Sequence, residues 1–486
     1  MKRLLFFFFV WVHITCAGQT AKYWIYYSAT DLRSQVTDSL VAWETHESYY
    51  STLLNASSAP LTTLQVDCLR KHFPQLQFQK GKYLQYNQVD QPKAELNFAL
   101  EQIHAEAMVD AGYTAKGVKI GIIDGGFLYA PKAPKLAHFF KKKQIAAYKD
   151  FITPKLKPYG GNSNLDDQHG TEVWEMVGGY HAEKDIQHGL ATEATYYLAR
   201  TDHGAGEKRI EEEYFIKALE WMARKGIRLV NTSLGYTNGY DDPKEDYKPT
   251  QMNGTTAIAM ACQKAIEKYD MIIVGAAGNE GNLPWKVINT PADAKGVIAV
   301  GASKVKLLDK MSYSSIGPDF LDYLKPELTC YSSGGTSFAA PVITGLVACM
   351  LQANPQLSHE EVRHLLITSC NLYPYGNNYV GYGVPDARQI LASLQNKNNS
   401  TLSAVRRVKI KARSPLMERL LPPRKFRTKV GSEAVVVYHK YEEWKVSSKK
   451  VILPSRKKIV IKRPENTEQT TVVVGEQIYE VFWETR

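Results

Sequence analysis

The chain has 486 residues, 44% of them hydrophobic and 22% charged, and a formal net charge of +11 at pH 7. A chain of this length exceeds a single ordinary domain and readily buries a large core, so we expect two or three domains. Despite the positive charge, no helix-turn-helix, zinc finger or Gly-rich phosphate loop argues for nucleic acid as a partner, and no C-x-x-C or Cys/His spacing suggests a metal site.

The first 18 residues have the organisation of a secretory signal. Lys2 and Arg3 make the start basic, and residues 4–14 form an apolar run that is too short for a stable membrane span. We therefore expect residues 1–18 to be removed and the protein to be exported, to an extracellular or periplasmic location. Cys16 leaves a lipoprotein as the alternative, but residues 13–15 lack the leucine expected before a lipid-modified cysteine. No other segment reaches spanning length, so no transmembrane segment is expected.

Residues 19–95 predict a small α+β unit ahead of the rest of the chain. They open with a strand-like run at 22–27 and continue with a polar, helix-like segment. The stretch 86–96 is polar, contains Pro92 and lacks strong helical periodicity, so we expect it to be extended.

The middle of the chain alternates apolar runs with amphipathic segments such as 210–224. Short apolar runs of this kind are typical of strands buried in a parallel sheet. Strand-like runs occur at residues 118–123, 195–199, 227–230 and 297–300. The alternation predicts an α/β fold with a doubly wound, mainly parallel sheet.

Three short segments supply an acid, a base and a nucleophile, in that order. Asp124 directly follows the run 118–123, so its carboxylate is expected at the carboxyl end of a buried strand. His169 and Ser337 are flanked by Gly and Thr and followed by helix-like runs, and a helix N-terminus favours developing negative charge. A serine hydroxyl becomes a nucleophile when an imidazole, held in one tautomer by a carboxylate, takes its proton. The three residues therefore indicate nucleophilic catalysis.

The order of these residues distinguishes between families of serine hydrolases. The stretch 335–339 can be misread as the G-x-S-x-G elbow of α/β-hydrolases, but it ends in Ala339, and both partners lie upstream of Ser337. We therefore reject that interpretation. In order and spacing, the segments around Asp124, His169 and Ser337 instead resemble those of subtilisin-like serine proteases, the subtilases.

The resemblance covers roughly residues 97–392 and includes further segments. The run 271–281 resembles the subtilase strand and loop that carry the oxyanion-hole asparagine, here Asn279, whose amide would act together with the backbone N–H of Ser337. Two segments are expected to flank the pocket for the substrate side chain before the scissile bond, leaving an open and mainly apolar slot that prefers large apolar residues. Their residues are Ser233, Leu234, Gly235, Ala276, Ala277 and Gly278.

The resemblance implies an exported serine endopeptidase that cuts protein or peptide substrates through an acyl-enzyme on Ser337, without a cofactor. It allows a structural calcium ion, for which the sequence assigns no ligands. In subtilases a propeptide that chaperones folding and plugs the cleft precedes the enzyme. This implies that residues 19–95 are a propeptide of a zymogen, removed by a cut near residues 86–96, and a permanent accessory domain is the alternative.

Two departures from the subtilase pattern bear on this interpretation. Trp174 stands where a small residue normally packs, and either core packing or a role in shaping the cleft would explain it. Only residues 329–337 follow the Lys-Pro-Glu-Leu landmark up to and including the nucleophile Ser337, whereas subtilases usually have a longer loop there. The short loop and the basic C-terminal region keep a second hypothesis open, a catalytically inactive subtilase scaffold that acts as a surface or binding protein.

The cysteines do not define a disulfide framework. After removal of residues 1–18 an odd number remains, namely Cys68, Cys262, Cys330, Cys349 and Cys370. A Cys330–Cys370 disulfide is conceivable in an exported protein, although spacing alone cannot show it. Cys349 lies in an apolar helix-like run and is most simply a buried small residue.

The composition changes after residue 395. Residues 396–401 indicate a linker, and residues 401–486 contain an excess of Lys and Arg together with β-rich runs. We expect a small basic β-rich domain there, after a catalytic domain at 96–395. Its charge either forms a solvated face or contacts an anionic polysaccharide, lipid or acidic protein.

Overall fold

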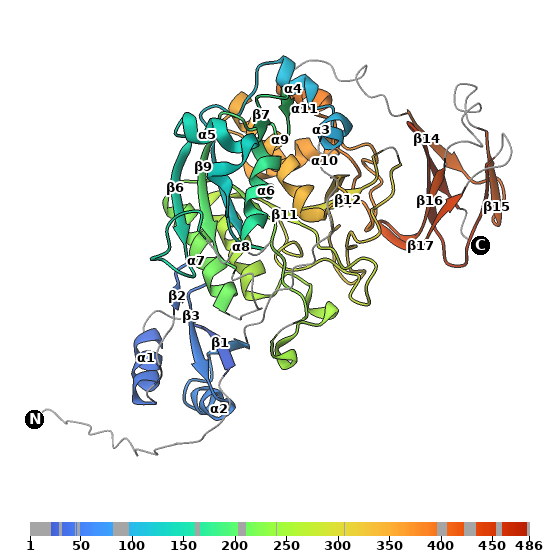
Figure 1. Cartoon of the computed structure of the whole chain (residues 1–486). Helices are drawn as coiled ribbons and strands as arrows, with labels where there is room; N and C mark the ends of the chain where they lie inside the picture. Colours follow the sequence, from blue (N-terminus) through green and yellow to red (C-terminus); the bar gives the residue numbers. More distant parts are fainter. Residues whose placement is uncertain are drawn as a thin grey trace, which may run out of the picture. The chain divides into compact units, whose positions relative to one another are not determined.

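The computed structural model describes residues 21–28, 32–43, 45, 49–80, 97–160, 166–202, 210–239, 241–305, 307–395, 406–421, 434–452 and 459–483. The expected signal segment (1–18), the cleavage stretch (86–96) and the linker (396–401) lie outside these residues. The chain divides into two compact units, residues 1–81 and 82–486 (Figure 1), and each is described by itself.

The first unit is a small α+β fold with its own core. Its four strands form an antiparallel sheet in the order β2-β3-β1-β4. The core includes Ile25, Val36, Leu40, Leu61 and Val66, all of them buried. The elements are β1 (Ala21–Tyr26), α1 (Leu32–Ala42), β2 (Tyr49–Ser51), β3 (Ala56–Leu61), α2 (Thr63–His72) and β4 (Gln77–Lys80). Strand β1 lies where the run 22–27 predicted a strand.

The second unit is built around a parallel sheet of seven strands in the order β13-β12-β11-β10-β5-β9-β6. Every neighbouring pair is parallel, so the carboxyl ends of all seven strands lie along one edge. The strands are β5 (Lys119–Asp124), β6 (Ile145–Asp150), β9 (Thr195–Arg200), β10 (Leu229–Thr232), β11 (Ile272–Ala276), β12 (Ile298–Ser303) and β13 (Leu328–Tyr331). The predicted doubly wound α/β fold is confirmed.

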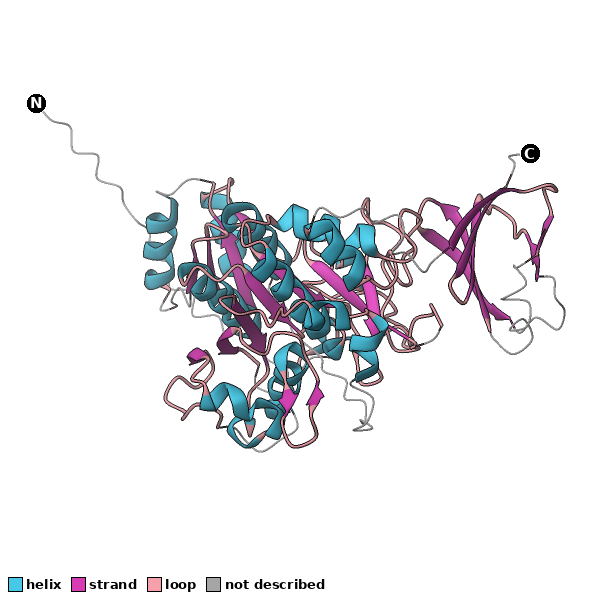
Figure 2. Ribbon diagram, turned by 90° about the horizontal axis from the view of Figure 1, so that it is seen from above, coloured by secondary structure: helices cyan, strands magenta, loops and turns pink. Residues whose placement is uncertain are grey.

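Helices cover both faces of this sheet (Figures 1 and 2). The side chains of Ile120 and Ile122 share the main core with those of α6 and α9, whereas a Cβ on Gly121 would meet Met222 of α7. The longer helices are α6 (Asp166–Gly178), α7 (Ile210–Arg224), α8 (Ala257–Tyr269), α9 (Ala340–Ala353), α10 (His359–Ser369) and α11 (Ala387–Leu394). Shorter elements are α3 (Asn97–Gln102), α4 (Glu106–Asp110), α5 (Ala137–Lys141), the hairpin of β7 (Tyr180–His181) and β8 (Ile186–Gln187), and the 3₁₀ turns η1 (Ala130–Lys132), η2 (Pro134–Leu136), η3 (Pro243–Glu245), η4 (Pro249–Gln251) and η5 (Thr336–Phe338).

One helical segment of the described residues, Thr336–Ala353, is long and apolar enough to cross a membrane by composition. It is 89% buried inside the protein, because it contains α9, the helix that packs against the sheet and α6. Its hydrophobicity is therefore accounted for by the core.

Two alternatives left by the sequence are decided by packing. Trp174 is fully buried and stacks on Phe139 with ring centroids 5.1 Å apart, so it is a core residue. The conceivable Cys330–Cys370 disulfide is absent: both cysteines are free and buried, and their thiols donate to the backbone oxygens of Ala339 and Leu366. Cys349 is also free and buried, as expected.

The C-terminal strands form a five-stranded sheet in the order β14-β20-β19-β16-β17, with a two-stranded β15-β18 ribbon beside it. Alternate residues of β16 contribute to two different cores: Val435 and Val437 pack with the ribbon, whereas Val436 and Tyr438 join the main core of the α/β region. The strands are β14 (Arg406–Lys411), β15 (Met417–Leu420), β16 (Val435–Glu442), β17 (Lys445–Ile452), β18 (Ile459–Lys462), β19 (Gln469–Val474) and β20 (Gln477–Phe482).

Direct hydrogen bonds join this sheet to the α/β region. The Tyr438 hydroxyl donates to the carbonyl oxygen of Leu308 (2.8 Å). Asn378 donates its N–H to the carbonyl oxygen of Trp444 (3.0 Å), and its side-chain oxygen accepts from Val446 N (3.1 Å). The C-terminal sheet is therefore docked by specific contacts as well as by apolar packing.

A buried ion pair lies on the docked face of the sheet. Lys440 Nζ is 3.7 Å from Glu480 Oε2, and both side chains are almost completely buried. The Lys440 ammonium also lies 5.9 Å from the ring centre of Tyr375, a residue of the α/β region. Burial lowers the pKa of Lys440 and raises the pKa of Glu480, because each charged form loses hydration.

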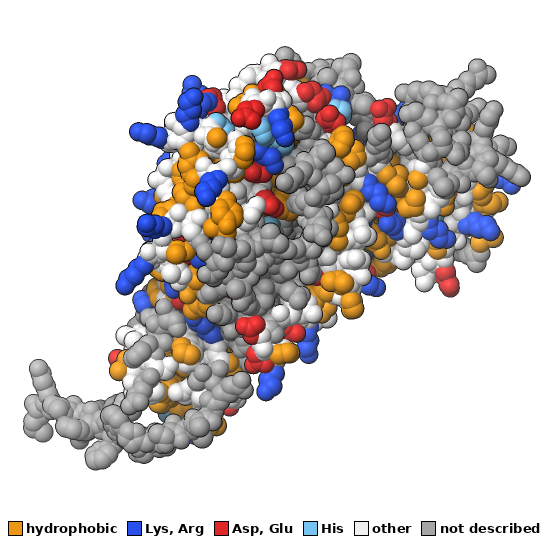
Figure 3. Space-filling model, viewed as in Figure 1, with side chains coloured by type: hydrophobic (Ala, Val, Ile, Leu, Met, Phe, Trp, Pro, Cys, Tyr) orange, Lys and Arg blue, Asp and Glu red, His pale blue; other side chains and the backbone are white. Residues whose placement is uncertain are grey.

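Several exposed basic side chains of the C-terminal region lie on β14, one of the two edge strands of the five-stranded sheet. Arg406, Lys409 and Lys411 are exposed there. Figure 3 shows Lys and Arg side chains scattered over the visible face rather than gathered in one patch. Charged side chains on an edge strand discourage pairing with another chain, which favours the solvated-face interpretation of the charge.

Candidate active site

An aspartate and a histidine form a buried pair at the carboxyl edge of the central sheet. Asp124 ends β5, and its Oδ1 lies 2.6 Å from Nδ1 of His169 in the first turn of α6. The same oxygen accepts the backbone N–H of Gly125 at 2.9 Å. Burial lowers the pKa of His169 to about 3, because an imidazolium would lose its hydration. The imidazole is therefore neutral at neutral pH and able to accept a proton.

Glycines allow helix α6 to approach the end of β5. A Cβ on Gly170 would lie 2.4 Å from the carbonyl oxygen of Gly126 and 2.9 Å from Cβ of Asp124, which are distances that real Cβ atoms do not show. A Cβ on Gly126 would meet the backbone of Asp167 at 2.5 Å. The glycines after Asp124 and His169 are thus required by the close contact that brings the two side chains together.

Arg200 connects the end of β5 with the start of α6 through its guanidinium. This residue was not identified from the sequence. Its guanidinium donates to Gly125 O (3.1 Å), Asp150 Oδ2 (3.1 Å) and Asp167 Oδ1 (2.7 Å). The side chain is only 3% exposed, and its two acidic partners hold the charge in the interior. Arg200 ends β9, and a charged residue after the apolar run 195–199 was the one available signal.

Ser337 lies in the 3₁₀ turn η5 that leads into α9. Its hydroxyl donates to the carbonyl oxygen of Ser233 (3.2 Å), and the Ser233 hydroxyl donates to Ser337 O (2.9 Å). The ring of Phe338, the next residue, is 5.6 Å from the His169 ring between centroids. These contacts place the serine between the end of β10 and the histidine.

Asn279 lies beside the same turn. Its side-chain oxygen accepts from Thr336 N (2.9 Å) and Thr336 Oγ1 (3.1 Å). This leaves the amide nitrogen as the atom that can donate to a bound substrate. Gly335 has φ +124°, a conformation that favours glycine, and it lets the chain pass within van der Waals contact of this amide.

The structure also brings together the two segments expected to bind substrate, with the amide of Asn289 between Gly235 and Gly278. The amide of Asn289 stands at this place: a Cβ on Gly235 would lie 1.6 Å from its Nδ2, and a Cβ on Gly278 would lie 3.2 Å from it. The open and mainly apolar slot for large apolar side chains stays a prediction. The sequence missed Asn289 because its position depends on a loop from outside both segments.

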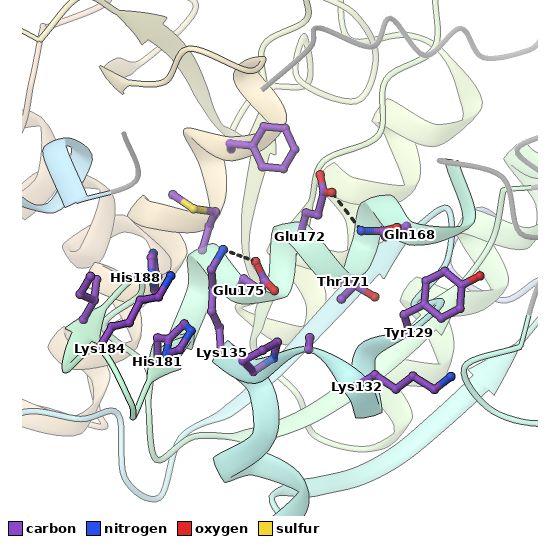
Figure 4. A pocket seen from close by; sticks show the side chains of 15 residues that line it. Tyr129, Lys132, Lys135, Gln168, Thr171, Glu172, Glu175, His181, Lys184 and His188 are labelled. Carbon is purple, nitrogen blue, oxygen red and sulfur yellow. Dashed lines mark hydrogen bonds and ion pairs between the residues drawn. The ribbon is translucent and has the colours of Figure 1, made fainter. Parts of the chain in front are cut away.

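A cavity of about 460 Å³ lies beside the 3₁₀ turn η5, which contributes Phe338 to its lining (Figure 4). Phe338 and residues of α6, including Gln168 and Glu172, contribute to its lining. Lys135 and Glu175 form an ion pair across it, with Nζ and Oε2 2.6 Å apart. The lining side chains are mixed in charge.

Within the described ranges, no three His, Cys, Asp or Glu side chains come together in a group that would hold a metal ion. The structure thus adds no ligands for the calcium ion that the resemblance allows.

The parallel sheet with helices on both faces, together with the Asp–His pair and the serine at its carboxyl edge, defines a subtilisin-like serine protease. The chain belongs to the subtilase family, whose family model matches residues 115–383. Subtilisin NAT of Bacillus subtilis subsp. natto is 25% identical over 341 residues, which cover 68% of this chain and 79% of that protein. Subtilisin DY of Bacillus licheniformis is 27% identical over 297 residues, which cover 58% of this chain and 96% of that protein.

Solved structures share the fold at lower identity. Fervidolysin from Fervidobacterium pennivorans, a keratinolytic enzyme related to subtilisin, matches with a TM-score of 0.57 and 18% identity, covering 93% of this chain and 70% of that chain. The epidermin leader peptide processing serine protease of Staphylococcus aureus matches with a TM-score of 0.55 and 17% identity, covering 78% of this chain and all of that chain.

Proposed function

We propose that the protein is an exported serine endopeptidase with Asp124, His169 and Ser337 as its catalytic triad. The observation that carries the proposal is the buried 2.6 Å contact between Asp124 Oδ1 and His169 Nδ1, beside the turn that holds Ser337. Such a contact fixes the proton on Nδ1 and leaves the other ring nitrogen to act as the base. Substrates are then proteins or peptides.

In the proposed reaction His169 takes the proton of Ser337 as the hydroxyl oxygen attacks the scissile carbonyl carbon. The amide of Asn279 and the N–H of Ser337 donate to the oxyanion that forms. His169 then gives the proton to the leaving amine, and water hydrolyses the acyl-enzyme by the same steps. In the resting structure the Ser337 hydroxyl donates to Ser233 O, and it must turn to His169 when substrate binds. Catalytic hydrogen bonds are often formed only in the substrate complex.

The alternative, an inactive scaffold with a binding role, is less well supported. An inactive relative would be expected to lack a residue of the triad or the oxyanion donor. In this chain Asp124, His169, Ser337 and Asn279 are all present, and the structure brings them to one edge of the sheet. The geometry therefore favours activity.

The proposal includes a signal segment at 1–18 and a propeptide at 19–95. The described part of the first unit has its own buried core, as expected of a segment that folds by itself and assists the folding of the enzyme. We propose that the triad makes the cut near residues 86–96, so that the protein is a zymogen. The remaining boundaries are then 96–395 for the catalytic domain and 401–486 for the C-terminal domain.

Covalent labelling of Ser337 tests the proposal. A fluorophosphonate should label the wild-type protein and leave Ser337→Ala unlabelled, and the variant should lose about a million-fold in turnover. Ser393→Ala, which changes a helix α11 serine away from the site, is the matched control and should be labelled like the wild type. Labelling of Ser337→Ala at the wild-type rate would contradict the assignment of the nucleophile.

The same variant tests autoprocessing. N-terminal sequencing should find the wild-type enzyme shortened to a start near residues 86–96, whereas Ser337→Ala should keep residues 19–95 attached. An active wild-type enzyme that still carries residues 19–95 would show that this region is an accessory domain.

A further inference from the structure

The connection between strand β13 and the turn that holds Ser337 is short. Residues 332–335 alone lie between the end of β13 at Tyr331 and the turn η5. Within this connection the Ser332 hydroxyl donates to the carbonyl oxygen of Gly335 (2.7 Å), and Gly335 has φ +124°. So short a connection offers few groups that can fix the turn, and the position of Ser337 therefore depends on contacts from other segments.

Tyr313 supplies such a contact with its hydroxyl. The hydroxyl donates to Ser332 O (2.6 Å) and accepts the backbone N–H of Gly335 (3.1 Å), so it bonds to both ends of the connection. The side chain is only 8% exposed, and burial raises the pKa of Tyr313 to about 12. The hydroxyl is therefore protonated at neutral pH, as donation to Ser332 requires.

The backbone of Tyr313 holds a second loop. Its carbonyl oxygen accepts the N–H of Gly281 (2.6 Å), two residues after Asn279. The two loops that Tyr313 joins carry the two proposed oxyanion donors, the amide of Asn279 and the N–H of Ser337. The loops also meet directly where Asn279 accepts from Thr336 N, so Tyr313 is a second link between them.

A buried lysine fixes the segment around Tyr313. Lys310 Nζ donates to three carbonyl oxygens, those of Met311 (3.2 Å), Ser312 (2.8 Å) and Ser314 (2.8 Å). These carbonyls lie on both sides of Tyr313 in the chain, and Lys310 is buried. Because each of these hydrogen bonds comes from a charged donor, the segment is a rigid support for the tyrosine.

We propose that Tyr313 is a positioning residue for the oxyanion hole. Its hydroxyl holds the Ser337 turn and its carbonyl oxygen holds the Asn279 loop, so the two donors keep the separation that the tetrahedral oxyanion requires. Donors of this kind lower the barrier only if their geometry is fixed before the reaction. This inference rests on the proposed protease function, and it assigns to Tyr313 the support that the short connection lacks.

Tyr313→Phe tests this role, because it removes the hydroxyl and keeps the ring. Gly335 N–H then loses its acceptor, and the Ser337 turn can shift. The kcat for a peptide should fall about ten-fold while KM changes little, since the oxyanion forms only on the way to the acyl-enzyme. The affinity for a peptide aldehyde, which forms a tetrahedral adduct with Ser337, should fall by a similar factor. Rates are normalised to the active sites titrated with a fluorophosphonate.

A double-mutant cycle with Asn279→Ala separates positioning from a general loss of structure. Asn279→Ala removes one of the two donors that Tyr313 aligns. Tyr313→Phe should therefore lower kcat by about three-fold or less in that background, against about ten-fold in the wild type. An equal factor in both backgrounds would show that Tyr313 acts independently of the oxyanion hole, and this result would overturn the proposal.

Tyr438→Phe is the matched control. It also removes a buried hydroxyl that donates to a backbone carbonyl, here Leu308 O (2.8 Å), but it does so on the docked face of the C-terminal sheet. Its kcat should equal that of the wild type. A matching fall of kcat in both variants would assign the effect to lost stability and contradict the role of Tyr313.

Hydrogen exchange on the wild-type enzyme tests the same contact without a variant. Because the Tyr313 hydroxyl accepts the buried N–H of Gly335, this amide should exchange far more slowly than a free glycine amide. Exchange at the free rate would overturn the proposal even if Tyr313→Phe did not fold.

The outcomes separate the inference from the proposed function. A labelled enzyme whose Tyr313→Phe variant keeps the wild-type kcat would overturn the role of Tyr313 and leave the protease function intact. A wild-type protein that neither reacts with the label nor cleaves any peptide would contradict the function itself.

Discussion

The central sheet and the C-terminal sheet both bury charged side chains, but at different places. In the central sheet Asp124 and Arg200 stand at the carboxyl ends of neighbouring parallel strands, where the chain turns and helix α6 begins. In the C-terminal sheet Lys440 and Glu480 lie in the middle of strands, on the face that contacts the α/β region. The first arrangement places charge beside the Asp124–His169 pair, and the second places it inside a covered surface.

This difference indicates two uses of buried charge. A charge at strand ends can be oriented by a few backbone groups and still contact a substrate, as at the topological edge of other parallel sheets. A charge pair on a covered sheet face contacts only protein, and its desolvation cost leaves little net stabilisation. We therefore expect changes at the first site to affect turnover and changes at the second to affect folding and docking.

The larger of two expected effects on stability sharpens the second half of this comparison. Glu480→Ala leaves the Lys440 ammonium buried without its carboxylate, which should lower the free energy of unfolding by about 3–5 kcal/mol. Urea denaturation measures the change, and Glu476→Ala, which removes an exposed carboxylate from the preceding turn, is the control and should have little effect. Equal stability of Glu480→Ala and the wild type would show that the pair contributes nothing to docking.

Asn279→Ala tests the first half of the comparison, the expectation that changes at the carboxyl edge of the central sheet affect turnover. If the amide binds the oxyanion more strongly than the ground-state carbonyl, kcat should fall by about 10² to 10³ while KM changes little. Steady-state kinetics on a peptide decides this, with the exposed Asn253→Ala as the control. A large rise in KM with unchanged kcat would make Asn279 a binding residue instead.

The smallest effect concerns a single hydrogen bond of the docked face. Tyr438→Phe removes the donor to Leu308 O from a fully buried position, so the unfolding free energy should fall by about 1 kcal/mol. The kcat/KM for a peptide should equal that of the wild type, because the bond is on the covered face. Reduced kcat/KM at unchanged stability would contradict this expectation and show that the two regions are coupled in function. Tyr269→Phe, on the surface of α8, is the control.

Much of the central fold was predictable because its signals are local. The run 118–123 is apolar throughout, as expected of a strand covered on both faces, and Asp124 follows it directly. His169 and Ser337 were found from motifs that include glycines, and the structure explains these glycines by the close approach at Gly170 and by the φ of +124° at Gly335. Each of these glycines lies within two residues of Asp124, His169 or Ser337, so the requirement appears in the sequence as a short motif.

Asn289 and Arg200 were not predictable in the same way. The place of Asn289 depends on the pairing of Thr290 with Tyr236, two residues far apart in the chain. Arg200 at the end of an apolar run is as consistent with a surface charge as with the buried one observed. Both cases depend on tertiary contacts that no short motif records.

The docking of the C-terminal sheet did leave a signal in the sequence, although the predicted linker at 396–401 suggested a separate domain. Residues 434–438 are apolar without alternation, and such a run is typical of a strand that is covered on both faces. A sheet with one solvated face would alternate apolar and polar residues. The two cores that share β16 explain the pattern.

For the exchange of parts between related enzymes, the docked sheet has a practical consequence. A chimera joined within residues 396–405 would transfer Tyr438 and Val446 without the backbone of Leu308 and the side chain of Asn378 that receive them. The transplanted sheet would then present an apolar face and a buried ion pair to whatever surface the new host offers. A successful graft must carry the receiving loops of the α/β region with it, so the natural unit of recombination is larger than the segment that the linker delimits.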